Sequence, residues 1–378
     1  MSKIEKSRVC PKCGARLQYF DPFSPGFITK ENYINHLNDH RVMLCDKCYH
    51  EHRQDEENEY LTLKNNELYA FLRKLKGKGT FIYVIDYVSF LSLFDDNISA
   101  ILKDEKTIVV INRINRIIPK LDVSYVRDFV TKAFVSHGID PLTVLFINDP
   151  KAEHEDIKAA LVDFVDMNQD VYVIGPKFSG KTVAIKSFLK NYSNHSDSPV
   201  VLDTKKLPFI TSKIPITKKS AIQEIEGFSN GKSLLEKVTY KLRQEMIAKS
   251  LITPISVSIH DRISLLFGGL AEINFIKAPK TRTTLITYAN QYFVRKHIEN
   301  NRFTNGLKAH KFIPTFNNSD ASGATETITI SLVKDVDFSL EISGLGFVIL
   351  PKGSYVIAIT LPDGVGITTS DRILIYAK

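Results

Sequence analysis

The stretch Val171–Thr182 (VYVIGPKFSGKT) restricts the possible folds of this chain more than any other. A short apolar run leads into an eight-residue loop, and an amphipathic helical pattern follows as far as Leu189. The glycine-rich loop consists of Gly175, Pro176, Lys177, Phe178, Ser179, Gly180, Lys181 and Thr182. It fits the pattern G-x-x-x-x-G-K-[ST], with the preceding strand and following helix that a phosphate-binding loop needs. The sequence therefore predicts an α/β fold that binds phosphate groups at this loop.

The polar groups of the glycine-rich loop have distinct predicted roles. The glycines allow successive backbone N–H groups to point at phosphate oxygens, and the start of the helix adds partial positive charge. The Lys181 ammonium would reach the β- and γ-phosphates, and the Thr182 hydroxyl would take a Mg²⁺ coordination position. The alternative is a plain glycine turn between a strand and a helix.

The four cysteines lie within the first 48 residues as two C-x-x-C pairs, Cys10/Cys13 and Cys45/Cys48. Two such pairs in a reducing compartment supply four thiolates for a tetrahedral, structural Zn²⁺. The alternative, a pair of redox motifs, lacks the βαβ context that such motifs need. Four cysteines complete a zinc site, so the nearby histidines are expected to be surface residues: His36, His40, His50 and His52.

Strands and helices alternate in the middle of the chain. Five apolar runs are predicted strands: Phe81–Asp86, Thr107–Asn112, Thr143–Asn148, Val171–Gly175 and Pro199–Asp203. Helical patterns lie at Asn66–Leu75, Asp122–His137, His154–Met167 and Gly180–Leu189. This alternation predicts a mainly parallel sheet that is covered on both faces. Such sheets bind ligands in the loops at the carboxyl ends of their strands.

The length of 378 residues predicts two or three domains. We expect a zinc-binding module over residues 1–60, an α/β domain over 61–250 and a C-terminal domain over 251–378. The last of these has short alternating segments, which predict an α+β or mostly-β module: Ser256–His260, Ala271–Ile276, Thr283–Tyr288, Glu326–Leu332, Phe338–Ile342, Gly346–Leu350, Tyr355–Thr360 and Arg372–Ile375.

The net charge of +8 permits a polyanionic partner without requiring one. In the C-terminal domain, phosphate binding and simple solvated charge remain equal alternatives for the basic residues: Lys277, Lys280, Arg282, Arg295, Lys296, Lys308 and Lys311. No apolar run approaches the ~20 residues that span a bilayer, and the N-terminus lacks the apolar segment of a signal peptide. We expect a cytoplasmic monomer that does not bind membranes.

A second loop at a strand end consists of Asn112, Arg113, Ile114 and Asn115. It resembles the N-K-x-D loop by which GTPases recognise guanine. In that pattern Asn112 holds the base, the aliphatic stem of Arg113 lies against it, and the fourth residue accepts hydrogen bonds from guanine. Because this loop precedes the glycine-rich loop in the sequence, the domain looks circularly permuted.

The order of zinc pairs, N-K-x-D-like loop, glycine-rich loop and β-rich C-terminal domain resembles the circularly permuted GTPases of the YqeH type, which are bacterial ribosome-assembly factors. Other stretches are similar too: Leu44–Cys48, Ile117–Lys120, Leu266–Ala271, Tyr288–Asn290 and Ile342–Phe347. The resemblance implies a P-loop GTPase domain that binds GTP and GDP with Mg²⁺ and hydrolyses slowly. It also implies contact with the small ribosomal subunit and its rRNA.

Several residues depart from the pattern of that family. Asn115 stands in place of Asp, and the loss of one charged acceptor predicts a cost of ~1 to 3 kcal/mol in guanine preference. Phe178 stands where the family carries an Asn that helps to hold potassium, so potassium-stimulated hydrolysis is not implied. Asn148–Lys151 replaces the S-A-K segment that contacts the base.

The segment after the glycine-rich loop carries the predicted switch residues. By resemblance, Thr211 is the switch threonine, and Glu224 with Gly227 matches the D-T-P-G segment. Glu224 would hold the Mg²⁺-bound water, and Asp203, at the end of an apolar strand, is the alternative. Phe228 follows Gly227 where Ras-like enzymes place a water-orienting glutamine.

The sequence thus favours a slow GTPase switch in assembly of the small ribosomal subunit, with the switch segments joined directly to the C-terminal domain. A second hypothesis is a degenerate relative that binds RNA or the ribosome without hydrolysis, and a third is a switch with altered base specificity. A P-loop kinase or ATPase is disfavoured, because the permuted order carries neither a lid nor a Walker-type arrangement.

Overall fold

A computed structural model describes most of the chain from residue 65 onward. The described ranges are 65–90, 94–113, 123–147, 168–185, 209–215, 218–229, 231–239, 254–287, 293–297 and 325–371, together with residues 10, 15–20, 26–30, 33–34, 45, 163, 166, 242–243, 246–247 and 289. The chain divides into two compact units. The N-terminal unit comprises Met1–Asn66 with Asn317–Gly323, and the main unit comprises Glu67–Phe316 with Ala324–Lys378.

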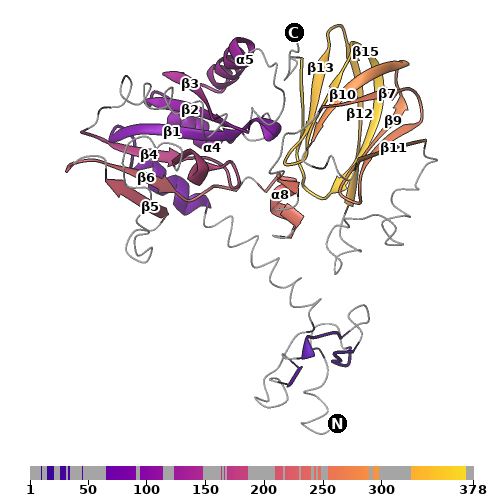
Figure 1. Ribbon diagram of the computed structural model, residues 1–378, viewed down its shortest axis with the longest axis horizontal. Helices are drawn as coiled ribbons and strands as arrows, with labels where there is room; N and C mark the ends of the chain where they lie inside the picture. The colour runs from indigo at the N-terminus through magenta and orange to yellow at the C-terminus, as the bar shows by residue number, and fades with distance from the viewer. Residues whose placement is uncertain are drawn as a thin grey trace. The chain divides into compact units, whose positions relative to one another are not determined.

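The first part of the main unit is a six-stranded sheet with the strand order β3-β2-β1-β4-β6-β5. The strands are β1 (Gly79–Asp86), β2 (Thr107–Asn112), β3 (Thr143–Ile147), β4 (Asp170–Ile174), β5 (Ile210–Pro215) and β6 (Ala221–Ile225). All neighbouring pairs are parallel except β5 and β6, which pair antiparallel. The carboxyl ends of five strands therefore meet at one edge, where the glycine-rich loop follows β4 (Figure 1).

Helical segments cover both faces of this sheet. The printed helices are η1 (Tyr87–Ser89), α4 (Asp96–Leu102) and α5 (Val123–Ser136), and residues 65–73 and 181–185 are also helical. On one face, Ala184 and Ile185 join a cluster of buried aliphatic strand residues that includes Val84 and Val173. On the other face, the ring of Phe134 in α5 meets Tyr83 of β1 edge-on at 5.5 Å. Burial on both faces explains why the strands read as continuous apolar runs.

The parallel sheet agrees closely with the sequence prediction. β2 has the predicted bounds, and β1, β3 and β4 each differ from them by one or two residues. The predicted strand Pro199–Asp203 and helix His154–Met167 lie outside the described residues, apart from residues 163 and 166. The β5–β6 hairpin was not predicted, because ITSKIP and AIQEI are short and mix polar with apolar residues.

The second part of the main unit consists of two antiparallel sheets of five strands each, ordered β16-β13-β14-β10-β7 and β11-β8-β9-β15-β12. We call this part the sandwich (Figure 1). The strands of the first sheet are β7 (Ile255–Ile259), β10 (Thr281–Thr287), β13 (Phe338–Ile342), β14 (Gly346–Leu350) and β16 (Ile367–Ser370). Those of the second are β8 (Ile263–Phe267), β9 (Glu272–Lys277), β11 (Phe293–His297), β12 (Thr325–Lys334) and β15 (Gly353–Pro362). The short helix α8 (Leu234–Lys237) precedes them.

The strands of the sandwich lie in the part of the chain for which short strands were predicted. β13 and β14 have the predicted bounds, whereas β8, β11 and β16 were missed. β8 reads ISLLF and is buried at every position, so it lacks the alternation of polar and apolar residues on which the prediction relied. The described residues together form a mixed α/β chain with many strands and few helices.

Candidate functional site

The glycine-rich loop needs glycine at two positions, because neighbouring groups leave no room for a side chain. Gly175 has a φ of +155°, and a Cβ there would lie 2.2 Å from the carbonyl oxygen of Val84. Gly180 has a φ of +94°, and a Cβ there would lie 1.9 Å from Nδ2 of Asn112. Because these two positions lack a side chain, the loop can lie directly against β1 and β2.

Lys181 is buried within the glycine-rich loop. Its ammonium donates to the carbonyl oxygens of Gly175 and Pro176, each at 3.2 Å. Burial lowers the pKa of Lys181 to about 8, against the opposing attraction of the Glu224 and Glu226 carboxylates. Among the described residues, the hydroxyl of Ser179 is buried without a hydrogen-bond partner. The loop therefore contains a buried ammonium and an unsatisfied hydroxyl, and a bound anion would suit both.

A cluster of oxygen atoms lies beside the loop. The Thr182 hydroxyl donates to Oε1 of Glu224 at 2.7 Å, and the Ser212 hydroxyl donates to Oε2 of the same carboxylate at 3.1 Å. Ser212 pairs with Glu224 across the β5–β6 hairpin, so both side chains face Thr182. One carboxylate and two hydroxyl groups are oxygen ligands of the kind that Mg²⁺ prefers.

The Asn112–Arg113 loop is tied directly to the glycine-rich loop. Nδ2 of Asn112 donates to the carbonyl oxygen of Ser179 at 2.9 Å. Arg113 has a φ of +66°, and its guanidinium donates to Asp86 at 2.5 Å and to the carbonyl oxygen of Phe178 at 3.1 Å. Asp86 ends β1, the strand between those that end in the two loops. The ion pair thus holds both loops in one fixed arrangement.

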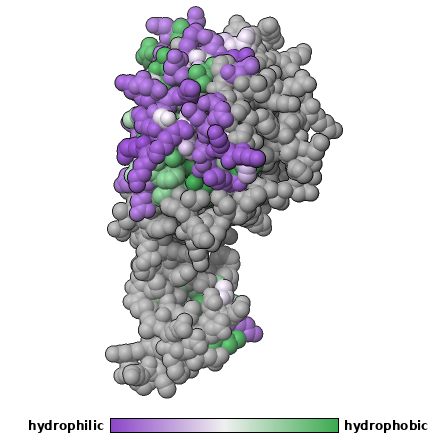
Figure 2. All heavy atoms as spheres, turned by 90° about the vertical axis from the view of Figure 1, so that its left-hand side faces the viewer, coloured by the Kyte–Doolittle hydropathy of each residue, from purple (hydrophilic) through white to green (hydrophobic). Residues whose placement is uncertain are grey.

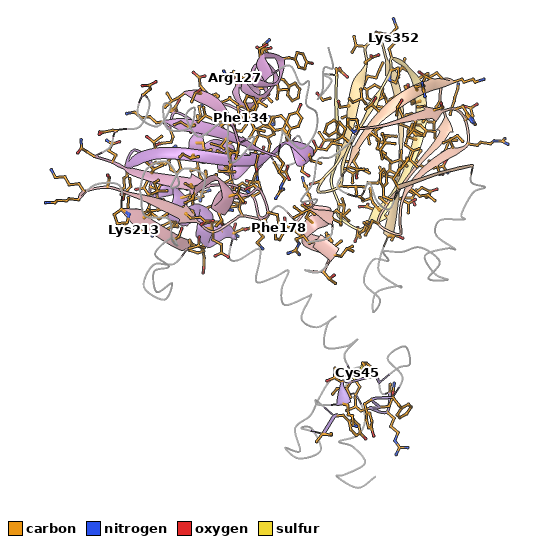
Figure 3. All side chains as sticks on the ribbon, viewed as in Figure 1. Cys45, Arg127, Phe134, Phe178, Lys213 and Lys352 are labelled. Carbon is orange, nitrogen blue, oxygen red and sulfur yellow. The ribbon has the colours of Figure 1, made fainter. Side chains whose placement is uncertain are left out.

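Phe178 has a second positively charged neighbour. The guanidinium carbon of Arg243 lies 4.0 Å from the centre of the Phe178 ring. Arg243 also donates to the carbonyl oxygens of Leu235, at 2.6 Å, and Val238, at 3.0 Å. Figure 3 shows Phe178 at the side of the sheet nearer to α8, the helix that contains Leu235. Arg243 therefore connects the glycine-rich loop to α8.

The segment after β6 lies along the glycine-rich loop. Lys177 donates its backbone N–H to the carbonyl oxygen of Phe228 at 2.9 Å. A Cβ at Gly227 would lie 2.8 Å from Nζ of Lys181 and 3.0 Å from the backbone of Lys177. Gly227 therefore packs closely against the Lys181 ammonium and the backbone of Lys177.

The structure brings most of the predicted site residues together. Lys181, Thr182, Asn112, Arg113, Glu224 and Gly227 all contact the glycine-rich loop or belong to it. Thr211 is exposed, and its hydroxyl donates to the backbone carbonyl of Glu224 at 3.3 Å. Asn115, Asn148–Lys151 and Asp203 lie outside the described residues.

Sequence reasoning missed Ser212, Asp86 and Arg243. Ser212 gave no local signal, because the pairing of β5 with β6 shifts register between Ile210 and Ser212, and this non-local pairing decides which hydroxyl faces the Glu224 carboxylate. Asp86 was visible as the polar end of an apolar strand. Arg243 carried no local signal, since its contact with Phe178 depends on the tertiary fold.

In the N-terminal unit, one cysteine from each C-x-x-C pair is described. Cys10 and Cys45 are both buried, and the backbone N–H of Cys45 donates to Sγ of Cys10 at 3.4 Å. Cys10 and Cys45 are therefore brought together, and Cys13 and Cys48 lie outside the described residues. Figure 3 labels Cys45.

No helix among the described residues combines the length and the apolar character that a membrane crossing requires.

The fold and the site define a mixed α/β protein with a glycine-rich loop at the carboxyl edge of a parallel sheet. No protein-family model matches the chain. The chain is 21% identical to protein YqeH of Bacillus subtilis over 372 residues, which cover 94% of this chain and 96% of that protein. The resemblance to the YqeH type that the motifs predicted is thereby confirmed.

Two plant proteins are also similar. NO-associated protein 1, chloroplastic/mitochondrial, of Arabidopsis thaliana is 25% identical over 240 residues, 60% of this chain and 42% of that protein. A rice protein (Oryza sativa subsp. japonica), provisionally named a nitric oxide synthase, is 24% identical over 317 residues, 75% of this chain and 57% of that protein. Both plant proteins extend well beyond the matched region.

Proposed function

We propose that this protein is a circularly permuted P-loop GTPase that binds GTP and GDP, hydrolyses GTP slowly and acts in assembly of the small ribosomal subunit. The observation that carries the proposal is the arrangement at the glycine-rich loop, where the Lys181 ammonium is held by the loop carbonyls and Thr182 donates to the Glu224 carboxylate. The similarity to YqeH along nearly the whole chain supports it. The sheet order supports the permutation, because the Asn112 and Gly175 loops meet at one edge although Asn112 comes first in the sequence.

The described residues fit a nucleotide and Mg²⁺. A bound triphosphate would supply oxygens that accept from the Lys181 ammonium and from backbone N–H groups of the loop. Thr182 and Glu224 would hold Mg²⁺, directly or through water, and Ser212 would orient the carboxylate. Glu224 presents both of its oxygens toward hydroxyl groups, so the longer side chain is accommodated beside the loop.

Base recognition belongs to the Asn112–Arg113 loop in this proposal. Asn112 and Arg113 are bound to the backbone of Ser179 and Phe178, so base and phosphate sites form one body. Asn115 in place of Asp lowers the preference for guanine by roughly tenfold to a hundredfold. Because of this Asp-to-Asn difference, a nucleotide switch with altered base specificity is a variant of the same proposed function.

Contacts between the site and the sandwich support a switch. In the first route, Arg243 contacts the ring of Phe178 and donates to the carbonyl oxygen of Leu235 in α8. The N–H of Leu234 in α8 then donates to the carbonyl oxygen of Ser343 at 2.8 Å. In the second route, Arg113 donates both to the carbonyl oxygen of Phe178 and to Asp86, which directly precedes η1. The hydroxyl of Ser89 in η1 accepts from the N–H of Gly344 at 2.8 Å. Both routes reach the same turn between β13 and β14.

This turn is closely fitted to α8. Gly344 has a φ of +76°, and a Cβ there would lie 2.4 Å from Oγ of Ser233 and 2.8 Å from the backbone nitrogen of Leu234. A movement of α8 would therefore displace the turn. We propose that the bound nucleotide, through these contacts, changes the affinity of the C-terminal domain for rRNA.

For the N-terminal unit, we propose a structural Zn²⁺ held by Cys10, Cys13, Cys45 and Cys48. Burial of Cys10 and Cys45 and the N–H···S hydrogen bond between them fit thiolate ligands. Such a metal would crosslink the two C-x-x-C segments, and its binding energy would contribute to folding of the module.

The alternative function is an assembly chaperone that binds RNA or the ribosome without hydrolysis. Phe228 favours it, because it follows Gly227 where a water-orienting side chain would be needed. Calorimetric titration with GDP, GTP, ATP and XTP analogues, followed by phosphate-release assays with and without small subunits, separates the two functions. Binding without release supports the chaperone, and binding of none of them refutes the nucleotide switch. Lys181→Ala should abolish every nucleotide effect.

A further inference from the structure

The sheet edge opposite to the glycine-rich loop carries a concentration of basic side chains. Parallel strands begin at this edge, which we call the amino edge. Four basic residues lie in the six positions before β1, and three more lie in β5 and in the turn that leads to β6: Arg73, Lys74, Lys76, Lys78, Lys213, Lys218 and Lys219. Six of the seven are exposed, and Lys213 is half-buried.

The topology brings these two basic segments together. β1 and β6 are separated by β4 alone in the sheet order. Since neighbouring strands lie about 4.8 Å apart, the amino ends of β1 and β6 are about 10 Å apart. Figure 2 views the molecule from this side, and most of the residues that are coloured there are hydrophilic. Figure 3 shows Lys213 at the end of the sheet remote from Phe178.

The acidic residues of the same edge are fewer than the basic ones, so they cancel only part of this charge. Asp170, which begins β4 between the two segments, accepts from the N–H of Ala221 at 2.8 Å and from Nε2 of Gln223 at 2.7 Å. Asp166 accepts from the N–H of Asn168 at 2.9 Å. Before β2, Lys103 and Lys106 are matched by Asp104 and Glu105, and the Glu105 carboxylate lies against the segment before β1, where it accepts from the N–H of Gly77 at 2.8 Å. Asp140 precedes β3. The segments around β1 and β6 keep an excess of positive charge.

We propose that the amino edge binds the phosphate backbone of RNA, as a contact surface separate from the nucleotide site. Flexible ammonium groups from several turns suit repeated phosphates, which carry most of the affinity in such contacts and do not require a pocket. The inference rests on the proposed function for its choice of RNA as the polyanion. Because the amino edge lies at the far ends of the strands from the glycine-rich loop, RNA and nucleotide could be bound together.

The test compares two full-length triple variants of equal charge. The edge variant is Lys76→Gln/Lys78→Gln/Lys218→Gln, and the control is Lys132→Gln/Lys232→Gln/Lys352→Gln, whose lysines are also exposed. Fluorescence anisotropy with a labelled 30-nucleotide oligo(U) would be measured across a series of KCl concentrations. We expect the edge variant to bind about tenfold more weakly at physiological salt, and the slope of log Kd against log salt to fall by about 2, since each lost phosphate contact removes ~0.7.

Three results would overturn the inference. The edge and control variants bind RNA equally, or wild-type protein binds no RNA, or poly-glutamate competes as well as unlabelled RNA of the same charge, which points to an acidic protein partner. GDP titration of the same samples keeps the proposed function separate. Unchanged GDP binding in the edge variant shows that it is folded, and absence of GDP binding in wild type refutes the nucleotide switch whatever the RNA result.

Discussion

The lowered pKa of Lys181 predicts that nucleotide binding takes up a proton at alkaline pH. In the nucleotide-free protein, burial lowers this pKa to about 8 from its ordinary value of 10.5. Phosphate oxygens at the ammonium favour its charged form and return the pKa toward the ordinary value. At pH 8.5 only about a quarter of the free protein carries the proton, so binding takes up about 0.8 proton, whereas at pH 7 it takes up about 0.1.

The same shift fixes how affinity depends on pH. The affinity for nucleotide is highest below pH 8 and falls as the pH rises from 8 to 10.5, because binding then requires that Lys181 take up a proton from solution. From pH 7.5 to 9.5 the expected loss is about twentyfold. Isothermal titration of Mg²⁺ and GDP in two buffers of different ionisation enthalpy measures the proton uptake directly.

The control for this experiment is Lys177→Arg. Lys177 is the other basic residue that affects the Lys181 ammonium, and arginine keeps its charge throughout this pH range. Proton uptake should persist in that variant. Uptake that disappears in Lys177→Arg assigns the proton to residue 177, and a lack of uptake in wild type at pH 8.5 refutes the assignment to Lys181.

Three further predictions concern the metal sites and the switch. Glu224→Gln should raise the Mg²⁺ concentration needed for half-maximal nucleotide binding about tenfold or more, whereas Ser212→Ala should raise it only a few-fold; equal effects would contradict their assigned roles. Arg243→Ala should cancel the nucleotide-dependent change in hydrogen exchange at the β13–β14 turn and leave GDP affinity within about threefold, with Arg282→Ala as the control; an undiminished response would show that Arg243 is not part of the route. Cys45→Ser should lose zinc, measured by elemental analysis, and loosen the N-terminal unit without altering GDP binding, and wild-type protein that contains no zinc would rule out the site.

The sequence predicted the parts of the fold that depend on local pattern. Strands such as β2 read as apolar runs because both of their faces are buried, and the loop after β4 is constrained by glycines that leave no space for a side chain. The pairing of β5 with β6 depends on a non-local hydrogen-bond register, and it decides which of two adjacent hydroxyl groups, Thr211 or Ser212, faces Glu224. Local pattern carries no information of that kind.

Phe178 shows how a residue that departs from a motif can acquire a structural role. Taken alone, a phenyl ring in a phosphate-binding loop is only the loss of a polar side chain. In the folded chain its backbone has a φ of +65°, its carbonyl oxygen accepts from Arg113, and its ring lies against Arg243. A cation–π contact of this kind contributes about 0.5 to 2 kcal/mol. This energy couples the loop to α8, so a movement of one favours a movement of the other. A polar side chain at this position would give up that contact, so the exchange binds the loop more firmly to the segment that reaches the sandwich, and α8 becomes the first element expected to respond when a nucleotide occupies the loop.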